Sequence, residues 1–200
     1  RITVRQALAM LEQKDLVYTV QGKGTFAKIP TISQHLLKIV SFGKMLEDKG
    51  LRGYTQIFAF DRIADNQREE TLLKASRQGG ICRMQLIGYA QTAPIVYYDS
   101  YLRIDAGLKM HLSAQEKAQQ GQAFSTFDLY REAGIRVKEI DQTIRAVNAD
   151  RRMAGILQVP RGTALMVLES MVLDENRMPM EHKIGYYRGD KYAFSVKRET

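Results

Sequence analysis

The sequence has no tryptophan, one cysteine and no long apolar run, and each shortage excludes a class of protein. The single cysteine, Cys82, rules out an intramolecular disulfide and favours a reducing, cytoplasmic compartment. No segment reaches the roughly 18 apolar residues of a membrane span, and no basic-then-apolar leader opens the chain. We therefore expect a protein that needs neither disulfides nor a membrane to fold.

Apolar and charged residues occur in ordinary globular proportions, with an excess of basic charge. The 200 residues are 44% apolar and 26% charged, enough for one domain and a small appendage. Thirty lysines and arginines face 22 acidic residues, which gives a net charge of +8. Basic charge is densest in the first thirty residues, where five basic side chains face two acids. This distribution permits nucleic acid as a partner without requiring it.

The first residues follow the pattern of a helix and then that of a hairpin. Apolar residues at helical spacing predict an amphipathic helix over residues 3–14, with a stripe made of Val4, Ala7, Leu8 and Leu11. Strands at 16–20 and 25–27 flank a tight turn made of Gln21, Gly22, Lys23 and Gly24. Because the chain begins inside the helical pattern without a cap residue, we expect its N-terminus to be a truncation.

A helix with outward basic and hydroxyl groups, followed by a basic hairpin with a glycine tip, is how a winged helix-turn-helix meets DNA. The helix reads base edges in the major groove, and the wing reaches phosphates or the minor groove. Arg1, Thr3 and Arg5 lie off the apolar stripe and face outward. The residues alone leave a second interpretation open, a surface helix packed on a hairpin with solvated arginines.

After Pro30 and a mostly polar stretch at 31–35, helical and strand patterns alternate. Strands are predicted over residues 53–63, 81–89, 95–102, 135–147, 163–173, 179–187 and 191–197, the last three as a meander. Helices are predicted over residues 36–40, 42–49, 65–75, 113–119, 125–132 and 153–157. Ser113 and Ser125 are expected to cap two of these helices. Short turns between the strands favour an α+β fold with a mostly antiparallel sheet.

The N-terminal residues closely resemble the recognition helix and wing of the GntR family of bacterial transcription regulators. The matching phrases are Arg1-Ile2-Thr3-Val4-Arg5-Gln6-Ala7-Leu8, then Leu11, Leu16-Val17 and Gly22-Lys23-Gly24-Thr25-Phe26. Asp15 departs from the family, which usually has glycine there, and the two helices and the strand that precede this point in the family are missing. The resemblance implies DNA contacts by Arg1, Thr3, Arg5, Gln21, Gly22, Lys23 and Gly24. It also implies that the chain as given binds DNA poorly, because its recognition helix lacks packing partners.

The rest of the chain is similar to the effector-binding UTRA domain of the HutC subfamily. The matching phrases are Ser41-Phe42, Pro94, Ser125, Gly134-Ile135-Arg136-Val137, Pro160-Arg161-Gly162-Thr163-Ala164-Leu165, Met180-Glu181-His182 and Tyr186-Tyr187-Arg188-Gly189-Asp190-Lys191-Tyr192. The resemblance implies a partial winged helix-turn-helix at 1–28, a linker at 29–35 and a chorismate-lyase-like domain with flanking helices at 36–200. It further implies a homodimeric repressor whose affinity for operator DNA changes when a small-molecule effector binds.

Carried over by position, the effector pocket implied by this resemblance comprises Ser41, Phe42, Leu86, Gly88, Tyr98, Ser125, Glu181, Tyr187 and Arg188. Serines before helices can help to hold polar groups, although they more often act only as caps. Glu181 can accept hydrogen bonds from hydroxyls or an amine, or be a solvated residue or an ion-pair partner.

Three departures inside this pocket bear on its ligand. Members that bind sugar phosphates place two arginines where this chain has Leu86 and Gly88, and a glutamate where it has Tyr98. Leucine and glycine cannot replace the guanidinium forks that grip a phosphate. We therefore expect a small polar metabolite, neutral or weakly charged, rather than a sugar phosphate held by an arginine pair.

The sequence holds no constellation that predicts catalysis, a metal or a cofactor. Cys82 lies in an apolar strand pattern, and His35, His111 and His182 show no metal-ligand spacing. Glu181 and His182 are neighbours in a strand, so they point to opposite faces and cannot share one metal. We expect a binding protein and not an enzyme; the alternative is a stand-alone lyase- or hydrolase-like enzyme that uses the same pocket.

Overall fold

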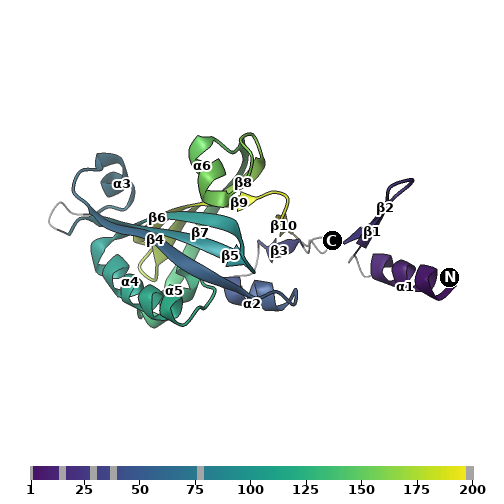
Figure 1. Cartoon of the computed structure of the whole chain (residues 1–200). Helices are drawn as coiled ribbons and strands as arrows, with labels where there is room; N and C mark the ends of the chain where they lie inside the picture. The colour runs from purple at the N-terminus through teal and green to yellow at the C-terminus, as the bar shows by residue number, and fades with distance from the viewer. Residues whose placement is uncertain (1, 14–16, 28–30, 37–39, 76–78, 197–200) are drawn as a thin grey trace, which may run out of the picture.

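The computed structural model describes residues 2–13, 17–27, 31–36, 40–75 and 79–196, and its first elements are a helix and a hairpin. Helix α1 (Ile2–Gln13) precedes strands β1 (Val17–Val20) and β2 (Gly24–Ala27), which pair antiparallel (Figure 1). Gly22 and Gly24 adopt φ angles of +77° and +123° at the turn, which glycine tolerates without strain. The predicted order of helix, strand, glycine turn and strand is confirmed.

A six-stranded antiparallel sheet forms the body of the molecule. Its strand order is β4-β5-β6-β9-β8-β7. The strands are β4 (Gly53–Ile63), β5 (Ile81–Ala90), β6 (Ala93–Arg103), β7 (Val137–Asn148), β8 (Ala164–Asp174) and β9 (Pro179–Arg188). The predicted α+β fold with a mostly antiparallel sheet is confirmed.

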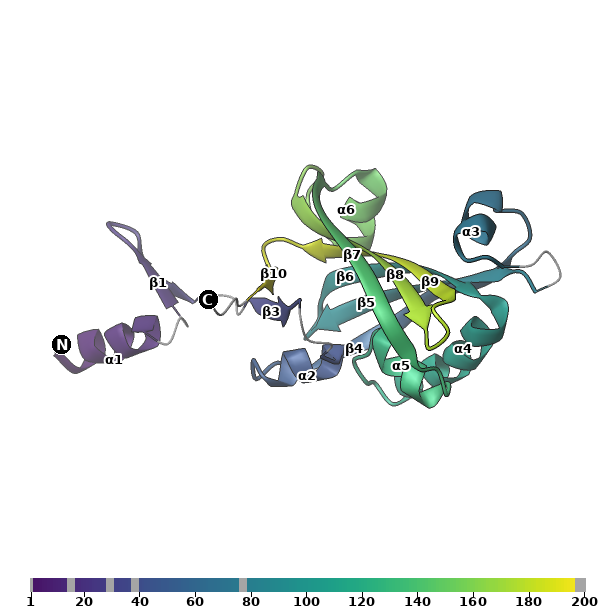
Figure 2. The ribbon, with the colours of Figure 1, turned by 180° about the vertical axis from the view of Figure 1, so that it is seen from behind.

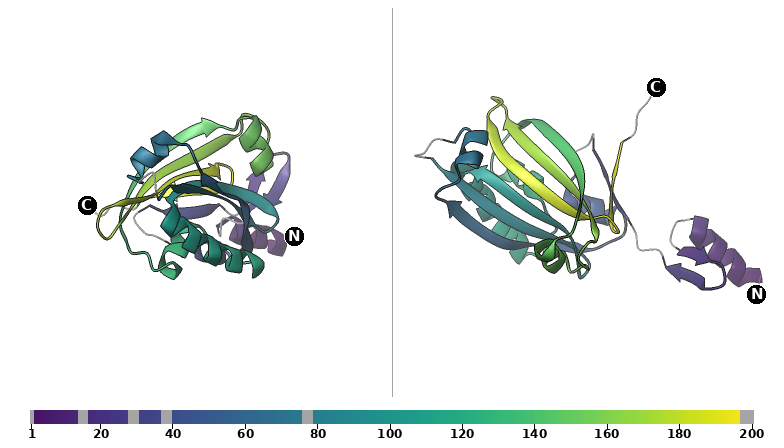
Figure 3. Two further views of the ribbon diagram at one scale, coloured as in Figure 1. Left: turned by 90° about the vertical axis from the view of Figure 1, so that its left-hand side faces the viewer. Right: turned by 90° about the horizontal axis from the view of Figure 1, so that it is seen from above.

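Helices cover both faces of this sheet. Helices α2 (Phe42–Glu47), α4 (Ile104–Gln119) and α5 (Thr126–Glu132) lie on one face, below the sheet in Figure 1. Helices α3 (Gln67–Leu72) and α6 (Arg151–Leu157) lie on the other, and Figure 3 shows the same layering end-on. Because side chains of each strand alternate between the two faces, the sheet has a hydrophobic core on each side. The larger core lies under α2, α4 and α5. No helix in the described ranges is long and apolar enough to cross a membrane.

Two short strands depart from the sequence expectation. We expected residues 31–35 within a linker and residues 191–197 as the third strand of a meander. Instead, β3 (Ile32–His35) and β10 (Tyr192–Ser195) pair with each other in parallel, away from the main sheet. The ribbon forms because alternate side chains are buried, and the Tyr192 hydroxyl donates to Gln34 Oε1 at 2.7 Å. The stretch at 31–35 is therefore not a plain polar connector.

Two predicted helices differ clearly in extent, and a third cannot be compared. The helix expected at 113–119 begins nine residues earlier, so Ser113 lies inside α4 and is not a cap. Gly107 packs α4 tightly against Cys82, since an added Cβ would overlap the thiol sulfur. The helix expected at 65–75 is confined to α3, where the Asn66 side chain caps the Glu69 amide at 3.2 Å. Most of the helix expected at 36–40 lies outside the described residues.

Candidate functional site

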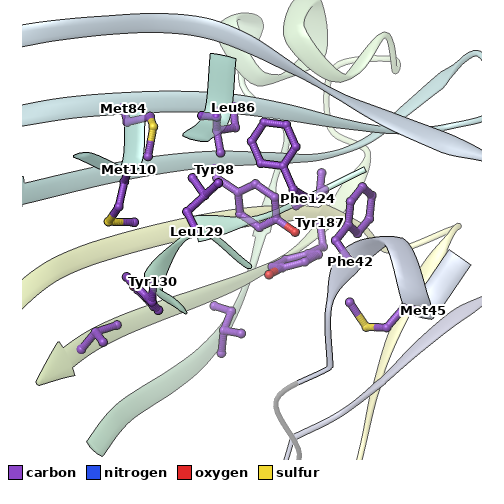
Figure 4. Close-up of a cluster of buried hydrophobic side chains, with 14 of the residues drawn as sticks. Phe42, Met45, Met84, Leu86, Tyr98, Met110, Phe124, Leu129, Tyr130 and Tyr187 are labelled. Atoms are coloured by element: carbon purple, nitrogen blue, oxygen red, sulfur yellow. The ribbon is translucent and has the colours of Figure 1, made fainter. Parts of the chain in front are cut away.

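Strand register brings most of the expected effector-binding residues onto one face of the sheet. Leu86 on β5 lies opposite Tyr98 on β6, and Gly88 lies opposite Val96, which in turn faces Tyr187 on β9. Residues directly opposite in a sheet share a face. Figure 4 shows the Leu86, Tyr98 and Tyr187 side chains converging with Phe42 of α2. The aromatic faces of the two tyrosines meet edge to face, with ring centroids 5.9 Å apart.

The apolar members of this set build the wall of the site. Phe42 and Leu86 are buried completely. Gly88 leaves room for the Phe42 ring, because a Cβ at that position would come within 2.8 Å of it. Burial also raises the pKa of Tyr98 and Tyr187 well above the ordinary tyrosine value, so both hydroxyls stay protonated and can donate.

Glu181 on β9 is a buried carboxylate with one oxygen left over. Its side chain is 0% exposed, which excludes the solvated interpretation. Oε2 accepts hydrogen bonds from the Tyr130 hydroxyl and from Thr126 Oγ1, the latter at 3.2 Å. Oε1 has no partner among the described residues. An unsatisfied buried acceptor of this kind costs about 1–3 kcal/mol unless something donates to it.

Lys183, which the sequence analysis missed, lies next to Glu181 on the same face. Its buried ammonium donates to Thr126 Oγ1 at 2.8 Å and lies 3.9 Å from Glu181 Oε2. It also sits 3.3 Å from the centroid of the Phe127 ring. Burial lowers the pKa of Lys183, and the neighbouring carboxylate of Glu181 opposes that shift. Lys183 follows Glu181 by two residues in a strand, and residues two apart point to the same face, so the sequence could have identified it.

A second buried polar atom lies in the same cluster. Ser100 on β6 faces Lys183 across the β6–β9 ladder, so the two side chains share a face. Ser100 Oγ has no hydrogen-bond partner within the part of the chain that the structure describes. We name Ser100, Thr126, Tyr130, Glu181 and Lys183 the polar cluster. It offers two unused hydrogen-bonding atoms inside an otherwise apolar core.

The two expected serines both begin helices, as their sequence context indicates. Ser41 accepts from the Lys44 amide at 3.0 Å at the start of α2. At the start of α5, the Ser125 amide and hydroxyl donate to Asp128 Oδ2 at 2.7 and 3.2 Å. Both hydroxyls are therefore engaged in local capping.

An open cleft of about 930 Å³ lies between α2 and the α4–α5 hairpin, beside the polar cluster. Among the expected effector-binding residues only Ser41 lines it, together with basic side chains that include Arg52 and Arg131. The cleft and the buried cluster are thus different spaces. Phe127 adjoins both, since it lines the cleft and its ring centroid lies 3.3 Å from the Lys183 ammonium.

Arg188 is the expected effector-binding residue that the fold keeps apart from the others. It follows Tyr187 in β9 and therefore points to the opposite face. Its guanidinium holds Asp190 at 3.0 and 2.7 Å, and this pairing lowers the pKa of Asp190. His182 also lies on that opposite face, as expected, between Glu69 and Glu169 at 2.8 and 2.9 Å. The described residues contain no group of three or more side chains suited to a metal ion.

The candidate DNA interface lies on α1 and the hairpin. Thr3 and Arg5 are exposed on α1, and the turn residues Gln21, Gly22, Lys23 and Gly24 are all exposed. Arg1 lies outside the described residues. Of the apolar stripe, only Leu8 is half-buried, and Val4 is 63% exposed. The apolar stripe of α1 therefore lies open to solvent along most of its length.

Comparisons with known proteins point to transcription regulators. The UTRA domain model matches residues 48–193. The chain is 23% identical to the HTH-type transcriptional repressor NagR of Bacillus subtilis (strain 168) over 97% of this chain and 77% of that protein. The crystal structure of PhnF from Mycobacterium smegmatis superposes with a TM-score of 0.79 at 20% identity, covering 99% of this chain and 84% of that one. A GntR-family transcriptional regulator from Enterococcus faecalis V583 gives a TM-score of 0.58 at 20% identity, covering 72% and 99%.

Proposed function

This chain belongs to the UTRA domain family, and from that premise we propose that it is a ligand-responsive transcription repressor of the GntR family, HutC subfamily. A small polar metabolite bound on the inner face of the sheet changes the affinity of the N-terminal unit for operator DNA. The observation that carries the proposal is the buried Glu181 carboxylate, whose Oε1 has no hydrogen-bond partner among the described residues. The similar proteins are regulators, so we propose binding without turnover rather than a lyase- or hydrolase-like enzyme.

The polar cluster defines what the effector must carry. Glu181 Oε1 accepts only, so the ligand donates to it from a hydroxyl or an amine. The Lys183 ammonium and the Tyr98 and Tyr187 hydroxyls can donate to acceptors on the ligand. Leu86 and Gly88 supply shape but no charge. We propose that the effector is a polyhydroxylated or amine-bearing metabolite, with Ser41 and Ser125 near the rim of its site.

Phe127 is the proposed point of entry. Its side chain adjoins both the open cleft and the Lys183 ammonium, and it is only half-buried. Rotation of this side chain toward the cleft opens a path to the polar cluster without unfolding α5. A ligand that enters replaces the ring over Lys183 and supplies the hydrogen bonds that Glu181 and Ser100 lack.

The β3–β10 ribbon is the proposed route from the pocket to the DNA-binding unit. The Tyr187 ring lies 4.5 Å from Tyr192 and 5.0 Å from Phe194, both on β10 (centroid distances). β10 pairs with β3, whose first residue, Ile32, follows the segment leading from the hairpin. A ligand that displaces Tyr187 therefore acts on the strand that holds β3, and it shifts the equilibrium only through such a differential contact.

The proposed operator contacts are the exposed residues of α1 and the wing turn. Arg5 and Thr3 face solvent on α1, and Lys23 lies at the tip of the hairpin, whose glycines allow a close approach to DNA. Arg1 belongs to the same proposed contact set. Because two half-sites about one DNA turn (~10 bp) apart match a two-fold protein, we also propose a homodimer formed chiefly by residues 36–200.

The test of this function is a ligand screen by thermal shift on the full chain. The panel pairs amines and polyols with their phosphorylated forms. We expect an unphosphorylated compound to raise the melting temperature. Glu181→Gln should abolish that rise while keeping the fold, since glutamine preserves the volume. Glu47→Gln, an exposed glutamate that lines the open cleft, is the matched control and should leave it unchanged. A phosphorylated compound that binds more tightly than its unphosphorylated form, and binds Glu181→Gln as well as wild type, would contradict the proposed role of Glu181 in ligand binding.

A further inference from the structure

The two edge strands of the sheet differ in how well they are protected from pairing with another strand. On β4, the Thr55 amide donates to Gln122 O at 2.9 Å, and a bulge between Ile57 and Ala59 interrupts the strand. At the opposite edge, β7 pairs with β8 alone within the described part of the chain. It is twelve residues long, contains no proline, and has its bulge at its first residues. Figure 2 shows it as the long green strand crossing the front of the domain.

The side chains of β7 are open to solvent on both faces. Residues 143–148 are all exposed. Ile144 and Val147 lie on opposite faces, and each is 39% exposed. Natural proteins commonly blunt such edges with proline, bulges or cover from another element, because an open edge is a template for another strand. Among the described residues, no proline, bulge or covering element protects the second half of β7.

We propose that β7 pairs antiparallel with β7 of a second copy of this chain, so that the two sheets become continuous across the dimer. The proposal rests on the homodimer proposed above and specifies its surface. Antiparallel addition at a sheet edge uses backbone hydrogen bonds for affinity and alternate side chains for specificity. Across a two-fold axis, β7 of each copy pairs with β7 of the other, so one surface supplies both sides of the interface.

The side chains of β7 are self-complementary when the two-fold axis passes through Gln142. In that register Ile140 faces the partner's Ile144, and Glu139 faces the partner's Arg145. Each contact occurs twice by symmetry. Arg145 already donates to Glu169 at 2.6 Å, so its guanidinium is held in place for a second carboxylate. Apolar and opposite-charge cross-strand pairs both stabilise a sheet.

The charge pattern favours a second copy over an unrelated strand. Moving the axis by one residue, to Thr143, pairs Asp141 with the partner's Arg145 but sets Ile144 opposite Gln142, so the contact between isoleucines is lost while every side chain keeps its face. Only the axis at Gln142 joins the two isoleucines and the two opposite charges at once. A foreign peptide would have to supply the same sequence of apolar and charged residues.

Single-cysteine cross-linking of the full chain tests this surface. Gln142→Cys faces its own copy in the proposed register and should form a disulfide-linked dimer under mild oxidation. Lys138→Cys is the matched control on the same exposed strand, since its own copy lies eight residues away, about 26 Å. Native Cys82 is buried with its pKa raised to about 12, so it stays inert in both variants. We expect at least tenfold more covalent dimer from Gln142→Cys than from Lys138→Cys.

Light scattering on the same samples separates failure of this surface from failure of the dimer. A chain that is dimeric but cross-links equally at both positions, or better through Thr143→Cys, overturns the proposed register and leaves the homodimer standing. A chain that is monomeric at micromolar concentration overturns both proposals.

A second variant keeps the surface testable without cysteine chemistry. Ile144→Lys places a charge opposite the partner's Ile140 and should raise the dimer dissociation constant at least tenfold. Ile144→Val keeps the apolar contact and should change it by less than threefold. Unchanged dimerisation in Ile144→Lys, with a native melting transition, would contradict the proposal.

Discussion

At the scale of single residues, the polar cluster under α5 is the least ordinary feature of the core. Thr126 accepts from Lys183 and donates to Glu181, so one hydroxyl links two buried charges that are too far apart to bond directly. Burying an ion pair seldom adds stability over an apolar core. The cluster therefore fits the proposed binding role better than a structural one, and we propose that the ligand bonds to the free oxygens of Glu181 and Ser100.

Arg5 is the residue through which the DNA contact can be tested. Arg5→Ala removes one exposed cation from α1 and should weaken operator binding by the intact regulator. If Arg5 contacts a phosphate, the slope of log affinity against log salt falls by about one. Fluorescence anisotropy over a salt series measures both quantities. Arg161→Ala, an exposed arginine of the sheet domain, should alter neither, and an equal effect of the two variants would remove Arg5 from the interface.

Glu169 gives a prediction for pH. Its hydrogen bond from His182, and secondarily the charge of Arg145, lower its pKa below the ordinary value of 4.5. A carboxyl whose pKa is lower in the folded state than in the unfolded state stabilises the fold at pH values above the unfolded pKa. This stabilisation is lost as the pH falls through the folded pKa. Glu169→Gln should therefore cost about 0.5–1 kcal/mol near pH 6, and the difference from wild type should shrink as the pH falls below 4.5 and through the folded pKa. Urea unfolding at a series of pH values measures it, and a pH-independent difference would contradict this assignment.

At the scale of elements, the β3–β10 ribbon connects the aromatic pocket with the chain that leads to the DNA-binding unit. Paired residues of the two strands, such as Ile32 and Tyr192, are 160 positions apart in the sequence, and the strands are joined by side-chain as well as backbone hydrogen bonds. Because Tyr192 contacts Tyr187 on one side and Gln34 on the other, we propose that it transmits ligand binding to the ribbon.

Tyr192→Phe separates ligand binding from its transmission. The variant keeps the ring against Tyr187 and removes the hydrogen bond to Gln34, at a stability cost of about 1 kcal/mol. Ligand affinity by calorimetry should stay within twofold, while the ligand's effect on operator affinity should fall severalfold. Tyr101→Phe, on the opposite face of the sheet, is the control. A normal ligand effect in Tyr192→Phe would exclude the ribbon as the route.

Local signals predicted the six main strands well and their helices less well. β4 was predicted with its observed bounds because it is rich in aromatic and β-branched residues. The pairing of β10 with β3 could not be predicted, since a four-residue parallel pair between distant segments leaves no local period. The start of α4 was missed because Asp105 and Gly107 resemble a turn, while tertiary packing against Cys82 selects glycine inside a helix.

The sequence predicted which of the proposed site residues share a face of the sheet, but not how their side chains contact one another. Leu86, Tyr98, Glu181 and Tyr187 converge because the alternation of strand residues fixes their face. Lys183 escaped notice because a lysine in a strand is usually solvated, and only the packing of α5 over β9 shows that it is buried. Which atoms remain unpaired depends on side-chain geometry that no spacing encodes.

At the scale of the whole molecule, we propose that the N-terminal unit, the β3–β10 ribbon and the sheet domain work as one switch, in which occupancy of the polar cluster changes operator affinity. The direct measurement is an anisotropy titration of operator DNA by the intact regulator, at fixed salt, with and without the compound found by thermal shift. Wild type should lose at least tenfold in affinity when the compound is saturating. Glu181→Gln should bind the operator as wild type does and ignore the compound. A compound that binds at Glu181 yet leaves operator affinity unchanged would contradict the account.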